Sequence, residues 1–417
     1  MLNPISFFSL RTDIDLKPEN VASARSYIDK YWRGLTRFNP KDDETLIGLP
    51  HPYLVPAFSE KTDFDFNEMY YWDSYFMVQG MLDEDHKELV LGILDNFIYL
   101  YKRFGIIPNA TRTYLMGRSQ PPLLTSFIFD VYSAYNLSDT WLKTHIKVAI
   151  EEYENVWMGQ FKPVSHQVYR GLSRYYDTNV LHDLAELESA WDMTPRFNRK
   201  ALNYLPVDLN ALLYKYEMDF SRAFKIFGDK RQAAKWADAA EQRKNTMDEL
   251  MWDKTKGLYF DYNYVKEKRG TVCSLASFYP LWAGMVDKQK ADILVKSLKR
   301  FEHKGGLATT DSLPVGQFVF GAMPTQWAFP NGWAPLHYLV IKGLERYGYH
   351  KVARRIATKW LKTNLGWFNK NGIFLEKYNV VSPDKPPVKG VYPSQEGFGW
   401  TNAVFERLCQ EYIDRAA

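Results

Sequence analysis

The chain has 417 residues, of which 46% are apolar and 24% charged, as is typical of a folded globular protein. Its net charge of +4 comes from 53 basic and 49 acidic residues spread without a dense run, so no nucleic-acid groove is indicated. The two cysteines, Cys273 and Cys409, give neither a disulfide framework nor a metal-ligand spacing. They fit a reducing compartment, and we expect a cytoplasmic protein.

The first residues, Met1 to Ile5, lack a basic start and a long apolar run, so we expect no signal peptide. No apolar stretch is long enough to cross a membrane. Membrane partners are therefore not expected.

The first half of the chain alternates predicted helices with irregular segments. Apolar periodicity predicts helices over 19–37, 68–81, 86–104, 122–136 and 140–158. Residues 40–66 are rich in proline and aspartate, which predicts an extended loop over the core.

The second half continues the pattern. Helices are predicted over 208–227, 231–252, 272–284, 288–300, 334–347, 350–364 and 400–415, with a short strand pair around 257–264. Helix pairs separated by long loops favour an all-α ring of helical hairpins, with the loops at one end forming a pocket. We expect a single catalytic domain over residues 1–417, with residues 1–48 as an N-terminal helix and extended lead-in.

Two carboxylates are the candidates for acid–base chemistry. Asp192 follows Trp191 in a run of small and aromatic residues that Pro195 closes, and a carboxylic acid shielded from water by an indole keeps its proton longer. We propose Glu376, in the run 374–379, as the second carboxylate. The alternative is that each is a helix cap or an ion-pair partner, of Arg196 and Lys377 respectively.

Polar residues near aromatic rings are the candidates for sugar binding. Asp73 follows Trp72 among aromatics and either accepts hydrogen bonds from hydroxyl groups or caps a helix. The loop 107–122 gathers fixed donors and acceptors that suit a polyhydroxylated ligand, although capping and surface ion pairs are the alternative. The residues concerned are Asn109, Arg112, Arg118 and Gln120.

Two later runs complete the candidate pocket. Residues 326–335 bring together Trp327, Asn331 and Trp333, in a segment that could also be a structural entry to the next helix. Residues 395–402 include Trp400, and Thr401 or Asn402 could cap the last helix. No phosphate-binding glycine loop, zinc-binding His-Glu-x-x-His run or nucleophile elbow occurs, and the eight histidines lack paired spacing, so no metal site is expected.

Taken together, these runs resemble the trehalase family of glycoside hydrolases. The resemblance extends from about Leu49 to Phe405 and is carried, in the family's order, by LPHPYLVP, EMYYWDSYF, IPNATRTYLMGRSQPP, ESAWDM, VDLNA, QWAFPNGWAP, FLEKYN and QEGFGWTNAVF. It implies an (α/α)6 toroid of six helical hairpins, an inverting mechanism, and no metal or organic cofactor. It also implies Asp192 as general acid and Glu376 as general base. Pocket-lining positions of the family fall on Trp72, Asp73, Asn109, Arg118, Gln120, Trp191 and Trp327.

The sequence also departs from the family. The family's P-G-G-R-F run is replaced by residues 56–66, and its arginine has no clear counterpart. Ala328 replaces the aspartate of Q-W-D, Val391 stands where a glutamate is expected, and the segment between Tyr176 and Glu188 is shortened. These changes affect the side of the pocket that would hold the leaving sugar.

The leading prediction is therefore an inverting α-glycosidase that hydrolyses α,α-trehalose to two glucose molecules. A second interpretation is hydrolysis of glucosylglycerate or mannosylglycerate, in which Lys61, Arg112 or Arg174 could hold the carboxylate. A third is a sugar-binding protein without turnover, against which the retained acid–base pair argues. The expected partner is a small sugar, and the expected state is a monomer.

Overall fold

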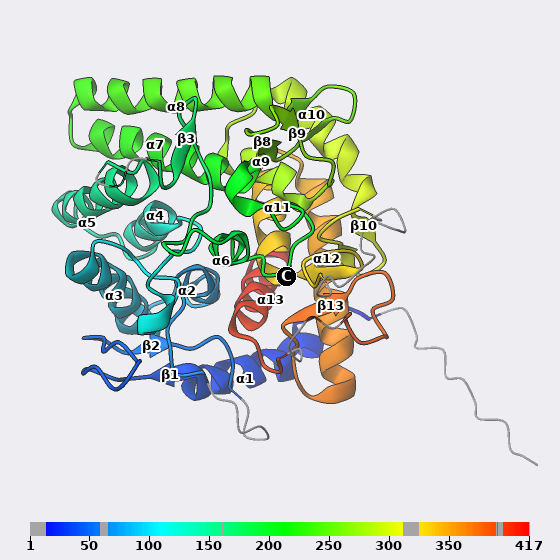
Figure 1. Cartoon of the computed structure of the whole chain (residues 1–417). Coiled ribbons are helices and arrows are strands. Elements are labelled where there is room, and N and C mark those ends of the chain that lie inside the picture. The colour runs from blue at the N-terminus through cyan, green and yellow to red at the C-terminus, as the bar shows by residue number, and fades with distance from the viewer. Residues whose placement is uncertain are drawn as a thin grey trace, which may run out of the picture.

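The computed structural model describes residues 14–58, 66–160, 162, 164–311, 325–388, 390 and 395–416. Helices dominate, and the strands are short pairs rather than an extended sheet (Figure 1). None of the described helices is both long enough and apolar enough to cross a bilayer.

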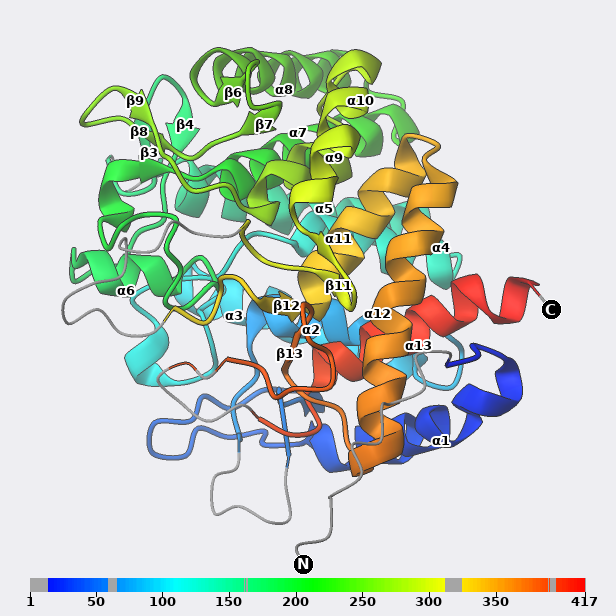
Figure 2. The ribbon, with the colours of Figure 1, turned by 90° about the vertical axis from the view of Figure 1, so that its right-hand side faces the viewer.

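Within the described residues, six helices form an inner ring and six others cover it from outside (Figures 1 and 2). The inner helices are α2 (Tyr71–Val78), α4 (Leu124–Ala134), α7 (Val207–Ile226), α9 (Tyr279–Ala283), α11 (Ala334–Arg346) and α13 (Gly399–Tyr412). The outer helices are α1 (Pro18–Leu35), α3 (Lys87–Phe104), α5 (Asp139–Glu152), α8 (Lys230–Leu250), α10 (Lys288–Ser297) and α12 (His350–Asn371). The predicted all-α (α/α)6 toroid is confirmed.

Neighbouring inner helices pack on one another around the ring. Helix α13 lies between α2 and α11, α9 lies between α11 and α7, and α7 packs on α4. The junction between α4 and α2 is made by Tyr71, whose hydroxyl accepts hydrogen bonds from the amides of Leu123 (3.2 Å) and Leu124 (2.9 Å). Most residues of each inner helix are therefore buried.

Helix α1, at the start of the described chain, is bound to α13, the last inner helix. Helix α1 packs on α12 and α13. The guanidinium of Arg25 donates to both carboxylate oxygens of Glu406 (2.9 and 2.6 Å) and to Asp414 (3.1 Å). Two segments 381 positions apart are thereby joined.

Helix ends follow local sequence signals. Ser138, Asp229 and Asp287 cap α5, α8 and α10 by accepting a backbone N–H in the first turn. Gly105 and Gly372 end α3 and α12 with φ of 70° and 73°, a left-handed conformation that glycine adopts without a Cβ clash.

Several predicted helices differ in length from the observed ones, and three of the differences have a local cause. Helix α2 begins at Tyr71 rather than at residue 68, because Tyr70 pairs with Ala110 in a β-bridge. The segment predicted as one helix over 272–284 is a 3-10 turn, Leu275–Phe278, followed by the five-residue α9, whose second residue is Pro280. Helix α12 continues past residue 364 to Asn371, because Leu365 and Phe368 extend its buried stripe.

The strands lie in loops at the ends of the helices. They are β1 (Thr36–Arg37), β2 (Tyr53–Leu54), β3 (Gln167–Tyr169), β4 (Leu172–Ser173), β5 (Tyr204–Leu205), β6 (Trp252–Asp253), β7 (Leu258–Tyr259), β8 (Tyr262–Asn263), β9 (Lys268–Arg269), β10 (Glu302–His303), β11 (Gly306–Leu307), β12 (Asn331–Trp333) and β13 (Lys377–Asn379). The strand pair expected around 257–264 is replaced by the β6–β7 hairpin and by β8, which pairs with β5 and β9. A short helix that the sequence did not suggest, α6 (His182–Leu187), lies in the loop before Asp192.

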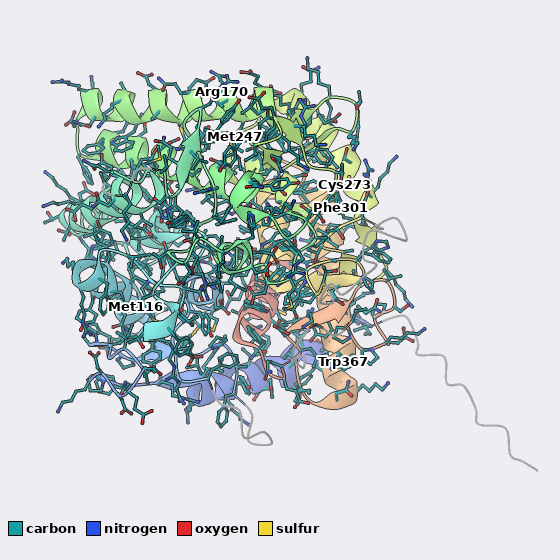
Figure 3. All side chains as sticks on the ribbon, in the orientation of Figure 1. Met116, Arg170, Met247, Cys273, Phe301 and Trp367 are labelled. Atoms are coloured by element: carbon teal, nitrogen blue, oxygen red, sulfur yellow. The ribbon has the colours of Figure 1, made fainter. Side chains whose placement is uncertain are left out.

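Side chains fill the interior of the molecule (Figure 3). Cys273, labelled in Figure 3, and Cys409 are both buried and free, as their spacing suggested. Within the described residues no group of three or more His, Cys, Asp or Glu side chains has a geometry that could hold a metal ion.

Candidate active site

The loops that precede the inner helices converge at one end of the ring. Trp72 and Asp73 lie in the first turn of α2, and Trp400 lies in the first turn of α13. Trp333 immediately precedes α11, and Asp192 lies in the loop that leads to α7. Asp73 is the third residue of α2 and does not cap it, since the position before the helix is Tyr70.

Asp192 lies in a loop with an unusual backbone. Ala190 and Met193, on either side of the Trp191–Asp192 pair, have φ of 58° and 60°, a region that residues other than glycine seldom enter. Ser189 supports the turn, because its hydroxyl donates to the carbonyl of Glu186 (2.6 Å) and accepts from the amide of Trp191 (3.1 Å). Backbone strain of this kind is concentrated at functional sites.

A buried arginine, Arg196, anchors this loop. The Arg196 guanidinium makes paired hydrogen bonds to Asp208 (2.8 and 2.6 Å) and to Asp261 (3.0 and 2.7 Å). Its central carbon also lies 4.6 Å from the centre of the Trp191 ring. Arg196 is thus the ion-pair partner of these two carboxylates, and the alternative that it pairs with Asp192 is wrong.

Glu376 is held by a different set of contacts, made by a short strand pair and its neighbours. It immediately precedes β13, which pairs with β12 so that Lys377 lies opposite Trp333. The Glu376 amide donates to the carbonyl of Gln395 (3.1 Å), and its carbonyl accepts from the indole of Trp400 (3.1 Å). The Lys377 ammonium donates to its carboxylate at 2.6 Å, so the ion pair considered from the sequence is present.

Three carboxyl groups share one electrostatic environment at this end of the ring. Burial raises the pKa of Asp192 to about 6, with Arg118 opposing the rise and the negative charge of Glu376 adding to it. Burial, then the charge of Asp192, and less strongly that of Glu376, raise the pKa of Asp73 to about 8. Burial also raises the pKa of Glu376, whereas Lys377 acts to lower it. A proton can therefore remain on this cluster near neutral pH.

Five tryptophans from four segments form a cluster beside these carboxyl groups. Trp327 is central: it stacks on Trp333 at 3.7 Å between ring centres and on Trp191 at 5.5 Å, and it meets Trp72 at 5.9 Å and Trp400 at 6.2 Å. The rings bury one another, and Trp400 at 5% is the most exposed of the five. They form a closely packed aromatic wall next to the carboxyl groups.

The loop 107–122 supplies polar groups to the same region. Gln120 accepts a hydrogen bond from the Trp72 amide (2.8 Å) and also acts on Asp73, whose pKa it lowers through a hydrogen bond. Arg118 is buried, donates to Asp177 (2.8 Å) and acts electrostatically on Asp192. The Asn109 amide donates to the backbone carbonyls of Ser119 (3.3 Å) and Leu187 (3.4 Å).

Two predicted sugar-binding residues are engaged with other parts of the protein. Arg112 donates to Glu68 (3.1 Å) and to Thr45 (3.0 Å). The Asn331 amide donates to the carbonyls of Gln326 and Val388 (3.0 Å each) and accepts from the amide of Val388 (2.9 Å). Both therefore position loops around the pocket.

Sequence reasoning missed two anchors of the acid loop. Glu188 is fully buried and accepts hydrogen bonds from the amides of Ser119 (2.8 Å) and Tyr176 (2.7 Å) and from His166. Glu186 accepts from the amide of Thr194 (3.1 Å), and burial raises its pKa to about 8. The only signal in the sequence was the spacing of three acids, at 186, 188 and 192, in an apolar run.

Some sequence-based expectations fall elsewhere. Lys61 and Val391 lie outside the described residues. Arg174, considered as a partner of a glycerate group, donates instead to the carbonyls of Ser165 (2.9 Å) and Leu202 (2.9 Å) and to the Tyr264 hydroxyl (2.9 Å).

The family model described as Trehalase matches residues 12–191 and 177–413 of the chain. A protein named cytosolic neutral trehalase, from Beauveria bassiana, is 34% identical over 445 residues, which cover 87% of this chain. The match covers 58% of that relative's length, so the chain is similar to little more than half of it.

Solved structures give the same picture. The neutral trehalase from Saccharomyces cerevisiae superposes with a TM-score of 0.75 at 30% identity, covering 91% of this chain and 77% of that one. A mannosylglycerate hydrolase from Thermus thermophilus has a TM-score of 0.66 at 17% identity, covering 94% of this chain and 99% of that one, which is a likeness of fold alone.

Proposed function

The chain belongs to the trehalase family, and from this premise we propose that it is an inverting glycoside hydrolase that cleaves α,α-trehalose into two glucose molecules. The observation that carries the proposal is that Asp192 and Glu376 come from distant segments, are both buried, and are close enough for the charge of Glu376 to raise the pKa of Asp192. An inverting glycosidase needs one acid and one base on opposite faces of the sugar.

Asp192 is the proposed general acid. The group that protonates the glycosidic oxygen has to carry a proton near neutral pH, and the pKa of Asp192 is raised to about 6 by burial. Closure of the pocket around a substrate would remove more water and raise the pKa of this carboxyl further. Arg118, which acts electrostatically on Asp192, limits the rise.

Glu376 is the proposed general base. It takes a proton from the attacking water, so its carboxylate has to be ionised when the substrate arrives. The ammonium of Lys377, 2.6 Å away, favours the ionised form of this buried group. The proton gained by Glu376 and the one lost by Asp192 are exchanged with solvent before the next cycle.

The remaining site residues have proposed binding or positioning roles. Asp73, Arg118 and Gln120 supply polar groups, and Trp72, Trp191, Trp327, Trp333 and Trp400 form the wall. Asn109, Arg112 and Asn331 hold the surrounding loops through their protein partners.

The decisive test is the anomeric form of the first products. One-dimensional NMR of early trehalose hydrolysis should show equal amounts of α- and β-glucose, because inversion at the attacked carbon gives β-glucose while the leaving glucose stays α. Exclusive α-glucose would contradict the inverting mechanism. Glucosylglycerate and mannosylglycerate are assayed in parallel, and turnover of these alone would assign the same chemistry to a different substrate. Binding of trehalose without release would favour the sugar-binding alternative.

We further propose a cytoplasmic, monomeric protein made of a single catalytic domain over residues 1–417. The relative from Beauveria bassiana is named as cytosolic, and both cysteines of this chain are free. Sedimentation of the purified protein tests the oligomeric state: a mass of one chain is expected, and a mass of two would contradict the proposal.

A further inference from the structure

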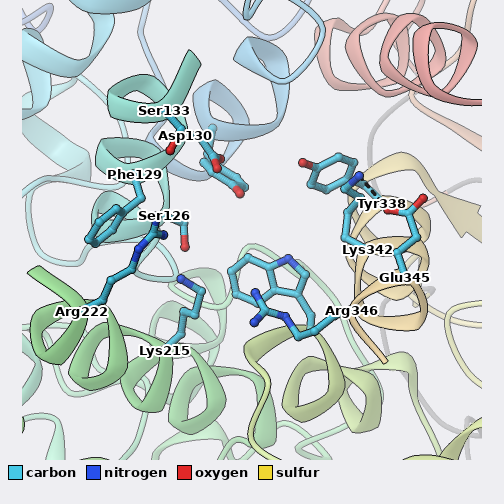
Figure 4. Close-up of a pocket in the computed structure, with 12 residues that line it drawn as sticks. Ser126, Phe129, Asp130, Ser133, Lys215, Arg222, Tyr338, Lys342, Glu345 and Arg346 are labelled. Carbon is cyan, nitrogen blue, oxygen red and sulfur yellow. Dashed lines mark hydrogen bonds and ion pairs between the residues drawn. The ribbon is translucent and has the colours of Figure 1, made fainter. Parts of the chain in front are cut away.

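A cavity of about 400 Å³ opens among the inner helices (Figure 4). Residues of α2, α4, α7, α9 and α11 line it, and none of the candidate acid–base residues Asp73, Asp192 and Glu376 is among them. The residues that line it are Tyr75, Ser126, Phe129, Asp130, Ser133, Lys215, Arg222, Trp282, Tyr338, Lys342, Glu345 and Arg346.

Three inner helices turn a polar face to this cavity. Helix α4 contributes positions 126, 130 and 133, α7 contributes 215 and 222, and α11 contributes 342, 345 and 346. These spacings of three, four and seven place the residues of each helix on one side of it. A helix in the centre of a ring is expected to be apolar on such a face, so these polar residues need another explanation.

The lining carries more positive than negative charge. Lys215, Arg222, Lys342 and Arg346 give four cations against the two carboxyl groups of Asp130 and Glu345, a formal excess of +2. Both lysines have carboxylate partners: Lys215 pairs with Asp219, and Lys342 pairs with Glu345 and Glu411 at 2.8 Å each.

The two arginines differ from the lysines. Within the part of the chain that the structure describes, neither Arg222 nor Arg346 forms a hydrogen bond or an ion pair. The Arg222 guanidinium lies 4.2 Å from the centre of the Phe129 ring. Figure 4 shows Lys215 and Arg222 reaching in from one side and Lys342 and Arg346 facing them from the other.

Helix dipoles do not account for the whole set. A cation in the last turn of a helix is stabilised by the carbonyl end, which explains Arg346 at the last position of α11. That effect fades beyond the last turn. Arg222 lies just before the last turn of α7, and Lys215 lies eleven residues before Ile226, where the helix ends. Asp130, whose pKa is raised by burial, is held by a hydrogen bond from Gln79.

We propose that this cavity binds a phosphate group, either as free phosphate or as the monoester of a small sugar or polyol. A phosphate monoester carries about −1.5 to −2 charges at pH 7, which matches the charges of Arg222 and Arg346, the two cations of the lining that have no carboxylate partner among the described residues. Guanidinium groups bind phosphate through two parallel N–H donors, and Ser126 and Ser133 add hydroxyl donors. The cavity is larger than phosphate needs, and Trp282 offers an aromatic face to an attached sugar.

Isothermal titration calorimetry at low salt tests the proposal, with glucose 6-phosphate, inorganic phosphate and glucose as separate probes. Saturable binding of at least one phosphate probe is expected. Each of Arg222→Ala and Arg346→Ala should weaken it at least tenfold. Both side chains are exposed, so the variants should fold, which circular dichroism checks. Arg33→Ala, which removes an exposed arginine on α1, is the matched control and should bind as the wild type does.

The probes also distinguish the two sources of phosphate. Tighter binding of glucose 6-phosphate than of phosphate indicates a monoester, and equal affinity indicates the free ion. Absence of saturable phosphate binding would overturn the proposal. Phosphate binding that both arginine variants retain would also overturn it. Equal binding of glucose without a phosphate would do the same, because it would place the probe in the sugar pocket. The readout does not depend on hydrolysis and therefore stands apart from the proposed function.

Discussion

The acid loop, residues 188–199, and the base strand, residues 373–379, bring their carboxyl groups to one centre but are anchored by different kinds of bond. Side chains hold the acid loop: Glu188 binds the amides of Ser119 and Tyr176, and Arg196 is clamped between Asp208 and Asp261. Its backbone enters the left-handed region at Ala190 and Met193.

The base strand is held mainly by main-chain groups. Strand β13 pairs with β12, the Glu376 amide donates to Gln395, and its carbonyl accepts from Trp400. Such contacts survive many substitutions, whereas each anchor of the acid loop depends on one particular side chain. We therefore expect the acid side to be more sensitive to mutation away from the carboxyl group itself.

The largest effect is expected at the two carboxyl groups, where the sides should be equivalent. Asp192→Asn and Glu376→Gln should each lower kcat on trehalose by about 10²- to 10⁴-fold, because each removes one proton transfer from the reaction. Initial-rate measurements check this. Asp183→Asn, an exposed carboxylate paired with Arg199, is the control and should keep full activity. Full activity of either site variant would remove that residue from its proposed role.

The second-largest effect is expected in the free energy of unfolding, and it distinguishes the acid loop from the base strand. Arg196→Leu leaves Asp208 and Asp261 buried without their cation, and loss of one partner from a buried ion pair costs about 3–5 kcal/mol. Chemical denaturation should show this loss, while Arg199→Ala on the exposed end of the same loop should leave the midpoint unchanged. Equal midpoints for the two variants would mean that Arg196 does not anchor the loop.

A smaller effect is expected in the pH profile of kcat/KM, whose two limbs report Glu376 and Asp192 separately. Glu376 has to be ionised to act, and Lys377 lowers its pKa, so Lys377→Met should move the acidic limb of kcat/KM about 1–3 pH units higher. The basic limb reports Asp192, which has to be protonated and whose pKa is about 6, and it should stay in place. The exposed Lys385→Met serves as control. A shift of the basic limb instead would exchange the two roles.

The smallest effect is expected in the tryptophan cluster that lies next to Asp192 and Glu376. Trp333 stacks on Trp327 at 3.7 Å and lies 4.8 Å from the Lys377 ammonium, so Trp333→Phe should raise the transition-state energy by about 0.5–1.5 kcal/mol. Trp236→Phe alters a buried ring contact with Phe220, between α8 and α7 and away from the carboxyl groups. It should leave kcat/KM unchanged, and an equal loss in both variants would indicate a general packing effect.

Apolar periodicity predicted most of the helices, because an amphipathic helix shows its buried stripe in the sequence. It failed where the fold overrides the local pattern. The residues before Tyr71 are drawn into a β-bridge, and the pairs of two or three residues that make β1 to β13 are too short to show alternation.

The candidate carboxylates could be found from the sequence because distinctive runs surround them, whereas their anchors could not. The partners of Arg196 lie 12 and 65 positions away, and nothing in the sequence indicates such a pairing. Ala190 has φ of 58°, a conformation that favours glycine, so an alanine at this position gave no sign of the left-handed turn.

The ion pair between Arg25 of α1 and Glu406 of α13 has a consequence for the order in which the protein can fold during synthesis. Arg25 meets Glu406 only after 381 further positions have been added to the chain, and the Glu376 carbonyl meets the Trp400 indole 24 positions after its own. A ribosome therefore releases the acid loop long before the base strand can be fastened. The ring therefore stays open, and its inner helices lack part of their packing partners, until α13 has left the ribosome.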